Sequence, residues 1–214
     1  MYVSEYMKTP VITVLESALI LEAQNTMKEH KIRRVPVVDI EGHLVGLVTQ
    51  DKLRETIPSP HTPMSVWDLQ YQLSKILVRN VMVKDVLTVT PETTVEATCV
   101  LGQEHNVGTL PVVDEQRKLV GIVTTTDLYR ITTEILGFGQ KGVRLYVSGD
   151  KQDVVHHEVL GILSKHKAEV LAIFPVAPVG SQKKDFVVHL ATEEAGPIAQ
   201  DIEGLGLKVE IRKH

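Results

Sequence analysis

Short apolar runs alternate with polar turns along the first 137 residues. Such runs, rich in valine and leucine and bounded by turn residues, are typical of β-strands, and residues spaced three and four apart indicate helices. Glu41-Gly42 suits a hairpin turn. The pattern predicts a strand at Ile12–Val14, a helix with Ile20, Ala23 and Met27 on one face, strands at Val35–Val38 and Leu44–Val48, and a helix at Asp51–Thr56.

This β-α-β-β-α pattern occurs a second time at an offset of 75 residues. Between Val35–Thr49 and Leu110–Thr124, nine of 15 positions are identical. The second copy predicts a strand at Leu87–Val89, a helix carrying Val95 and Cys99 with a capping box at Thr93 and Glu96, strands at Leu110–Val113 and Leu119–Val123, and a helix at Asp127–Leu136. Because a single unit leaves one face of its sheet exposed, we expect each copy to cover the other.

The segments His30–Leu53 and His105–Leu128 resemble the CBS domain, a small module named after cystathionine β-synthase. The resemblance covers residues 1 to 137 or so. It implies that the two units pair into one regulatory module, with ligands, usually adenine nucleotides, in clefts between them. The proline-rich segment Thr56–Ser65 is the expected linker, followed by a helix at Ser65–Val78.

The two copies differ at one chemically informative position. The ligand motif of the family is glycine, an apolar residue, any residue, threonine or serine, two further residues and aspartate, and residues Gly121 to Asp127 match it throughout. One carboxylate can accept hydrogen bonds from both hydroxyls of a ribose, and threonine hydroxyls can hold phosphate oxygens. Alternatively, Thr124 and Asp127 form a helix cap. The first copy keeps Thr49 but has Lys52 in place of the aspartate.

The resemblance implies that Asp127 faces the pre-proline segment of the other copy, where Arg33 and Arg34 precede Pro36. The arginines equally suit a helix end, where cations are favourable. The resulting candidate ligand residues are Ile12, Ile32, Arg33, Arg34, Thr124, Thr126 and Asp127. We expect one competent cleft and a degraded one beside Thr49 and Lys52. The candidate regulatory ligands are AMP, ADP, ATP, NAD and S-adenosylmethionine, and no cofactor is expected to be required.

Residues 143–214 predict the order strand, helix, strand, strand, helix, strand of a ferredoxin-like fold. The predicted elements are strands at Val143–Val147, Val170–Val176, Phe186–Leu190 and around Leu207, Val209 and Ile211, and helices at Asp153–His166 and after Pro197. The stretch Gly161–Ile173 resembles an ACT domain, a regulatory module that often binds amino acids between subunits. Asp153 stands where that family usually has glycine, which favours dimerisation over amino-acid binding.

A CBS pair followed by an ACT domain resembles the bacterial acetoin-utilisation proteins of the AcuB type. The resemblance implies four parts, with CBS units at residues 1–60 and 61–137, a hinge at 138–142 and an ACT-like domain at 143–214. The segment Gly137–Gly142 has the spacing of a dinucleotide fingerprint, but it follows a predicted helix and precedes a strand, so we interpret it as a hinge. The fold class is therefore mixed α+β and α/β.

The composition narrows the function further. The chain of 214 residues has a net charge of −4, which disfavours nucleic-acid binding, and its single cysteine, Cys99, excludes an internal disulfide. No secretory signal or long apolar segment is apparent, so we expect a cytoplasmic protein without membrane contact. The segment His156-His157-Glu158 lacks the spacing of a metalloprotease motif. We therefore predict no catalytic residues, no metal site and no enzyme activity. The expected protein is a homodimeric regulator with an unidentified target protein, or alternatively a structural interaction module without a nucleotide ligand.

Overall fold

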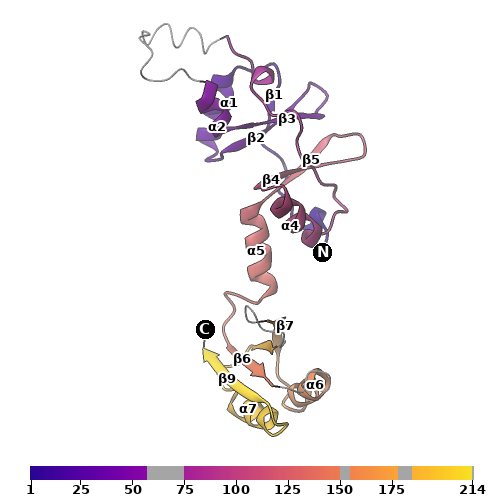
Figure 1. Ribbon diagram of the computed structural model, residues 1–214, viewed down its shortest axis with the longest axis vertical. Helices are drawn as coiled ribbons and strands as arrows, with labels where there is room; N and C mark the ends of the chain where they lie inside the picture. Colours follow the sequence, from indigo (N-terminus) through magenta and orange to yellow (C-terminus); the bar gives the residue numbers. More distant parts are fainter. Residues whose placement is uncertain (57–74, 150–154, 178–184, 214) are drawn as a thin grey trace. The chain divides into compact units, whose positions relative to one another are not determined.

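The computed structural model describes residues 1–56, 75–149, 155–177 and 185–213 (Figure 1). The chain divides into two compact units, Met1–Tyr129 and Arg130–His214. This two-part division does not decide the bounds of the four predicted parts, which stay predictions. Four predicted segments lie largely outside the described residues: the linker beyond Thr56, most of the helix Ser65–Val78, the turn with Asp153 and the loop before Asp185.

The first unit contains the two copies of the repeat up to Tyr129, which lies within the last helix of the second copy. The elements of the first copy are β1 (Val14–Leu15), α1 (Ile20–Glu29), β2 (Arg34–Val38), β3 (Leu44–Thr49) and α2 (Gln50–Thr56). Those of the second copy are α4 (Val95–Glu104), β4 (Thr109–Val113), β5 (Leu119–Thr124) and α5 (Thr125–Ile135). Short 3-10 turns lie at Val3–Glu5 and Val78–Asn80. The predicted helices and hairpins of both copies are thus confirmed.

The opening strand of each copy is shorter than predicted. In the first copy it is reduced to β1, which pairs in parallel with β2. In the second copy the strand predicted at Leu87–Val89 is wrong, because the described structure there contains only a parallel bridge between Val89 and Val112. The capping-box prediction was also wrong by one residue, since the hydroxyl of Thr94, not Thr93, accepts the amide of Ala97.

Helix α1 packs as its sequence periodicity predicts, whereas α4 does so only in part. Ile20, Ala23 and Met27 of α1 are buried, and they join the valines of β2 and β3 in one apolar core. In α4 the buried residues are Val95 and Thr98, whereas Cys99 is only partly buried. Burial raises the pKa of the Cys99 thiol, which disfavours its reactive thiolate form.

The leading segment of each copy forms a backbone bridge with a strand of the other copy. Lys8 forms an antiparallel bridge with Ile122 of β5, and Val83 forms the equivalent bridge with Leu47 of β3. The methionine before each bridge lies over a glycine, so that a Cβ at Gly46 would come within 2.5 Å of a sulfur atom. Only glycine leaves room for this close packing. The two copies are therefore interlocked through their leading segments.

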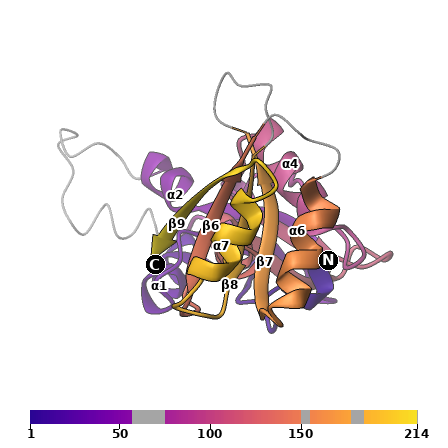
Figure 2. The same ribbon diagram turned by 90° about the horizontal axis from the view of Figure 1, so that it is seen from below.

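The second unit has the predicted β-α-β-β-α-β order. Its elements are β6 (Val143–Ser148), α6 (Val155–Lys165), β7 (Val170–Val176), β8 (Asp185–Leu190), α7 (Gly196–Glu203) and β9 (Lys208–Lys213). The strand order in the sheet is β7-β8-β6-β9, and all its pairs are antiparallel. Figure 2 shows α6 and α7 lying over this sheet.

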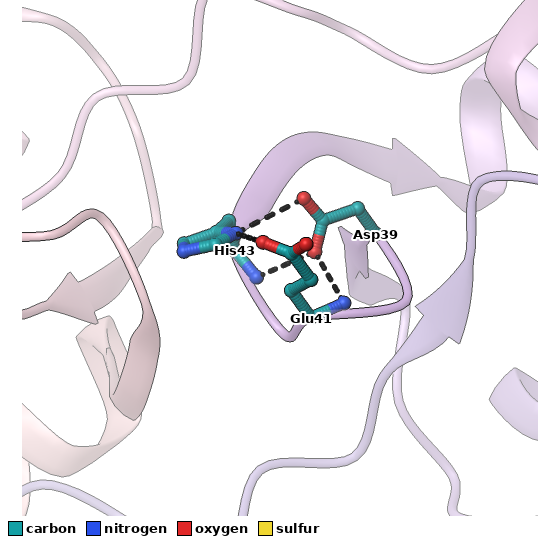
Figure 3. Close-up of side chains that lie close together, drawn as sticks. All are labelled: Asp39, Glu41 and His43. Carbon is teal, nitrogen blue, oxygen red and sulfur yellow. Dashed lines mark hydrogen bonds and ion pairs between the residues drawn. The ribbon is translucent and has the colours of Figure 1, made fainter.

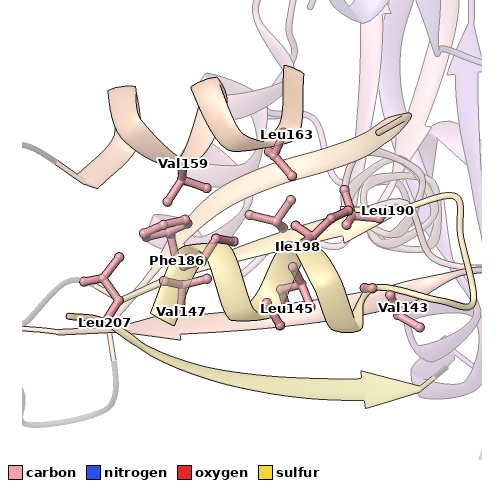
Figure 4. Close-up of a cluster of buried hydrophobic side chains, with 13 residues drawn as sticks. Val143, Leu145, Val147, Val159, Leu163, Phe186, Leu190, Ile198 and Leu207 are labelled. Atoms are coloured by element: carbon pink, nitrogen blue, oxygen red, sulfur yellow. The ribbon is translucent and has the colours of Figure 1, made fainter. Parts of the chain in front are cut away.

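One face of that sheet forms the core of the second unit (Figure 4). Alternate residues of β6, namely Val143, Leu145 and Val147, are buried against both helices. Val159 of α6 and Ile198 of α7 complete the contact from the other side. The ferredoxin-like order is present, while membership of the ACT family stays a prediction.

The glycine-rich segment after α5 does not form a nucleotide-binding turn. Gly137 adopts a φ of +68°, and the amides of Gly137 and Phe138 donate to the carbonyls of Glu134 and Thr133. These bonds end a helix, and glycine suits them because it tolerates positive φ. The segment follows α5 and precedes β6, so the context excludes the dinucleotide fingerprint, as predicted.

Candidate ligand-binding cleft

A cleft of about 540 Å³ lies between the two copies in the first unit. Six of the seven predicted ligand residues line it: Ile12, Ile32, Arg33, Arg34, Thr124 and Thr126. They come from the leading segment and β2 region of the first copy and from the β5–α5 junction of the second. The structure thus brings the two predicted halves of the site together, although they lie far apart in the sequence.

Both pre-proline segments face this cleft. The repeat comparison placed only the Arg33–Arg34 segment opposite Thr124, but Gly108 and Thr109 also contribute to the lining. A Cβ at Gly108 would lie 3.3 Å from Nη1 of Arg34, so this guanidinium reaches across to the other copy. Because Gly108 has no side chain, it leaves room for the Arg34 guanidinium. The sequence comparison did not predict this contact.

Asp127 lies behind the lining rather than in it. The residue is only 2% exposed. Its Oδ2 accepts the amide of Thr124 at 3.0 Å and also the Thr124 hydroxyl, while the Asp127 amide donates to that hydroxyl oxygen at 3.4 Å. These contacts confirm the predicted helix cap at the start of α5. The role of Asp127 toward a ligand stays a prediction, because a cap and a ligand contact do not exclude each other.

A lysine that the sequence analysis missed completes the surroundings of Asp127. Lys8 Nζ lies 2.7 Å from Asp127 Oδ1, and the Lys8 side chain is 61% exposed at the cleft. Burial of the carboxylate alone would raise the pKa of Asp127. The hydrogen bonds from Lys8 and Thr124 and the charge of Lys8 outweigh this effect, so the pKa is lowered and the carboxylate is ionised at neutral pH.

The comparison with protein families decides the identity of the repeat. The sequence model described as the CBS domain matches residues 3–59 and 78–134, which together exceed half of the chain. The chain belongs to the CBS domain family. Its first unit is a tandem CBS pair with mixed α/β content, and the cleft described above lies between the two CBS repeats.

Solved CBS structures share this fold. A Vibrio cholerae protein assigned to acetoin utilization (AcuB) is 28% identical, with a TM-score of 0.54 over 64% of this chain and 93% of that one. The CBS pair of protein MJ0100, solved with 5-methylthioadenosine and S-adenosyl-L-methionine, is 26% identical, with a TM-score of 0.51 over 62% and 95%. CBSX2, solved with AMP, is 28% identical, with a TM-score of 0.52 over 63% and 98%.

Curated relatives match over the CBS pair only. An L-aspartate semialdehyde sulfurtransferase of Methanocaldococcus jannaschii is 29% identical over 131 residues, which are 60% of this chain and 23% of that enzyme. The chain thus corresponds to about a quarter of the length of the first curated relatives, so their activities do not follow for it. Among the described helices, none is long and apolar enough to cross a membrane.

The lining of the CBS cleft is strongly cationic. It carries Lys8, Lys31, Arg33 and Arg34, and no carboxylate is among its described lining residues. Sequence reasoning missed the two lysines because they lie outside the family motif. The repeat offered a signal, since Val83 and Asn106 occupy the equivalent positions of the second CBS repeat. At these two positions, lysine is therefore present in the first CBS repeat and absent from the second.

At the position equivalent to Asp127, the first CBS repeat has a different arrangement. The amide of Lys52 donates to the Thr49 hydroxyl at 3.1 Å, which again caps the helix. The ammonium of Lys52 pairs with Glu55 at 2.8 Å on the same helix. The cap is thus common to both repeats, whereas, of these two described positions, only that of Asp127 has a buried carboxylate beside a lysine. The expectation of a degraded second cleft stays a prediction.

One group of three side chains offers ligand atoms that could hold a metal ion. Asp39, Glu41 and His43 lie together in the β2–β3 turn (Figure 3). Hydrogen bonds from the His43 amide, the His43 ring and the Glu41 amide lower the pKa of Asp39. Asp114 accepts the equivalent amides in the second repeat, where the matching side chains are Gln116 and Lys118. The common feature is therefore an aspartate that stabilises a turn. In the segment whose spacing did not fit a metalloprotease motif, the His157 side chain is exposed on α6.

Proposed function

We propose that this protein is a regulatory CBS module that binds an adenine nucleotide or related adenosyl ligand between its repeats. The observation that carries the proposal is the cleft itself, where predicted ligand residues of both repeats meet. Ligand pockets of small molecules commonly measure 300–1,000 Å³, and the cleft volume of about 540 Å³ falls in that range.

The chemistry of the lining supports a nucleotide. Ile12 and Ile32 supply apolar surface suited to a base, and Arg33 and Arg34 supply cations suited to phosphate. In this proposal Thr124 and Thr126 assist with hydroxyl groups, and Asp127 accepts the ribose hydroxyls after its Thr124 partner shifts. That CBSX2 was solved with AMP, and the MJ0100 pair with adenosyl compounds, is consistent with this assignment.

A second candidate is a structural interaction module without a nucleotide ligand. One observation favours it: both carboxylate oxygens of Asp127 already have partners, Oδ1 with Lys8 and Oδ2 with Thr124. A helix cap closed by an ion pair would explain the residue without any ligand. This candidate predicts no adenosyl binding at millimolar concentration.

Calorimetric titration of the full chain with AMP, ADP, ATP, NAD and S-adenosylmethionine separates the two candidates. Saturable binding that is lost in Asp127→Ala and weakened in the double variant Arg33→Ala/Arg34→Ala supports the sensor. Lys52→Ala is the matched control, since it alters the equivalent position of the other repeat and should leave binding intact. Binding of none of the five compounds would favour the interaction module.

We further propose that ligand binding changes the arrangement of the C-terminal βαββαβ unit or of a partner protein. The AcuB resemblance motivates an ACT-type regulatory role, a homodimer and a link to acetoin or central carbon metabolism. Such coupling requires that the ligand bind two conformations with different affinity. Solution scattering with and without the bound nucleotide tests it, and identical profiles at saturation would argue against transmission.

A further inference from the structure

Lys8 is held at the cleft by its own backbone. Its amide donates to the Ile122 carbonyl at 2.9 Å, and the Ile122 amide donates to the Lys8 carbonyl at 3.2 Å. This bridge places the Lys8 side chain beside the β5–α5 junction, where Nζ meets Asp127 Oδ1 at 2.7 Å. The position of the ammonium is therefore built into the packing of the two repeats.

The ammonium remains accessible from the cleft. An ammonium has three N–H donors, and the contact with Asp127 uses one of them. With its side chain 61% exposed, Lys8 can present further donors to a ligand in the cleft. Asp127 is the opposite case, because its side chain is 3% exposed and its charge is balanced by Lys8. The field that a ligand meets in the cleft is thus dominated by cations.

The repeat supplies an internal comparison for this pair. Lys8 corresponds to Val83, and Asp127 corresponds to Lys52. Both bridges are made in the same way by the backbone, so the fold does not require lysine at this position. The lysine and the carboxylate form a pair beside this cleft, and both are replaced at the equivalent positions of the repeat.

We propose that Lys8 determines the charge class of the ligand, so that the cleft selects phosphate-bearing adenine nucleotides over uncharged or cationic adenosyl compounds. The proposal rests on the proposed adenosyl-binding function. In the bound state Lys8 bridges the Asp127 carboxylate and a ligand phosphate oxygen, beside the guanidinium groups of Arg33 and Arg34. The sulfonium of S-adenosylmethionine would meet like charge there, whereas 5-methylthioadenosine offers the same nucleoside without a charge.

The test compares AMP, 5-methylthioadenosine and S-adenosylmethionine by calorimetric titration of the full chain. We expect the wild type to bind AMP at least tenfold more tightly than either adenosyl compound, since tenfold equals about 1.4 kcal/mol, the size of one hydrogen bond to a charged group. Lys8→Met should reduce the preference for AMP over 5-methylthioadenosine about tenfold. Lys8→Arg, which keeps the charge, should retain that preference. Added salt should weaken AMP binding and leave 5-methylthioadenosine unaffected.

The outcomes distinguish the two levels of the proposal. Failure of every adenosyl compound to bind the wild type would overturn the proposed function and this inference with it. Binding of 5-methylthioadenosine or S-adenosylmethionine as tight as that of AMP would leave the function standing and overturn the selection by charge. A uniform loss for all three ligands in Lys8→Met, or an unchanged preference, would overturn the role of Lys8. Lys31→Met serves as a control for removing a different cation from the same lining.

Discussion

Replacing Asp127 by alanine should destabilise the first unit even without any ligand. The substitution removes the acceptor of the Thr124 amide and the ion pair with Lys8. A hydrogen bond to a charged group contributes about 1.5–3 kcal/mol, and an ion pair with a largely exposed partner contributes about 0.5 kcal/mol. The expected loss of unfolding free energy is therefore about 2–3.5 kcal/mol. For a unit of this size that is a decrease in melting temperature of roughly 10 °C.

Scanning calorimetry of the full chain measures this change, because it can separate the unfolding of the two units. The effect should appear in one transition and leave the other in place. Lys52→Ala is the matched control, since its ammonium pairs with an exposed glutamate and its loss should cost about 0.5 kcal/mol or less. Equal stability of Asp127→Ala and the wild type at neutral pH would refute the assignment of Asp127 as a structural cap.

The pH dependence gives an independent check of the same carboxylate. The pKa of Asp127 is lowered in the folded protein, so the folded state favours the ionised form. Its contribution is fully present above the unfolded value of about 3.9 and is lost as the pH falls through the lower folded pKa. The stability difference between the wild type and Asp127→Ala should therefore shrink below about pH 4. A difference that grows on acidification would contradict this sign.

Four further substitutions test the packing and the α4 cap. Gly46→Ala should lower the free energy of unfolding by about 1–3 kcal/mol in a urea titration, because its Cβ would lie 2.9 Å from the Val83 carbonyl oxygen. Gly121→Ala should lower it less, since the new Cβ meets a flexible methionine side chain. The reverse order would count against the interlocked repeats. Leu145→Ala should destabilise the second unit by about 2–5 kcal/mol in calorimetry, and a change confined to the other transition would refute the two-unit division. Thr94→Ala should cost about 1 kcal/mol by urea unfolding through loss of the α4 cap, and no change would reassign that cap.

Much of the fold could be predicted because the repeat was present in the sequence twice. The hairpins β2–β3 and β4–β5 follow from short valine-rich runs around polar turns, and α1 follows from the spacing of its buried residues. The prediction of a strand at Leu87–Val89 was wrong because hydrophobic periodicity does not reveal where backbone pairing is reduced to one bridge. The cap of α4 was misplaced because Thr93 and Thr94 are equally able to cap, and the backbone conformation decides between them.

The candidate site was predictable to the extent that it follows the family motif. Ile32, Arg33 and Thr124 line the cleft, as the pairing of the repeats predicts. Lys8 was missed because its importance depends on a contact with Asp127 across the two repeats, which no local pattern records. Gly108 was missed for a similar reason, since its role is to leave space for Arg34 of the other repeat.

The most direct test of the account is a calorimetric titration of AMP into the chain of residues 1–214 at neutral pH, repeated with Asp127→Ala. The account predicts one saturable site per chain in the wild type and no measurable binding in the variant. Absence of binding to the wild type at millimolar AMP, or undiminished binding in Asp127→Ala, would contradict it.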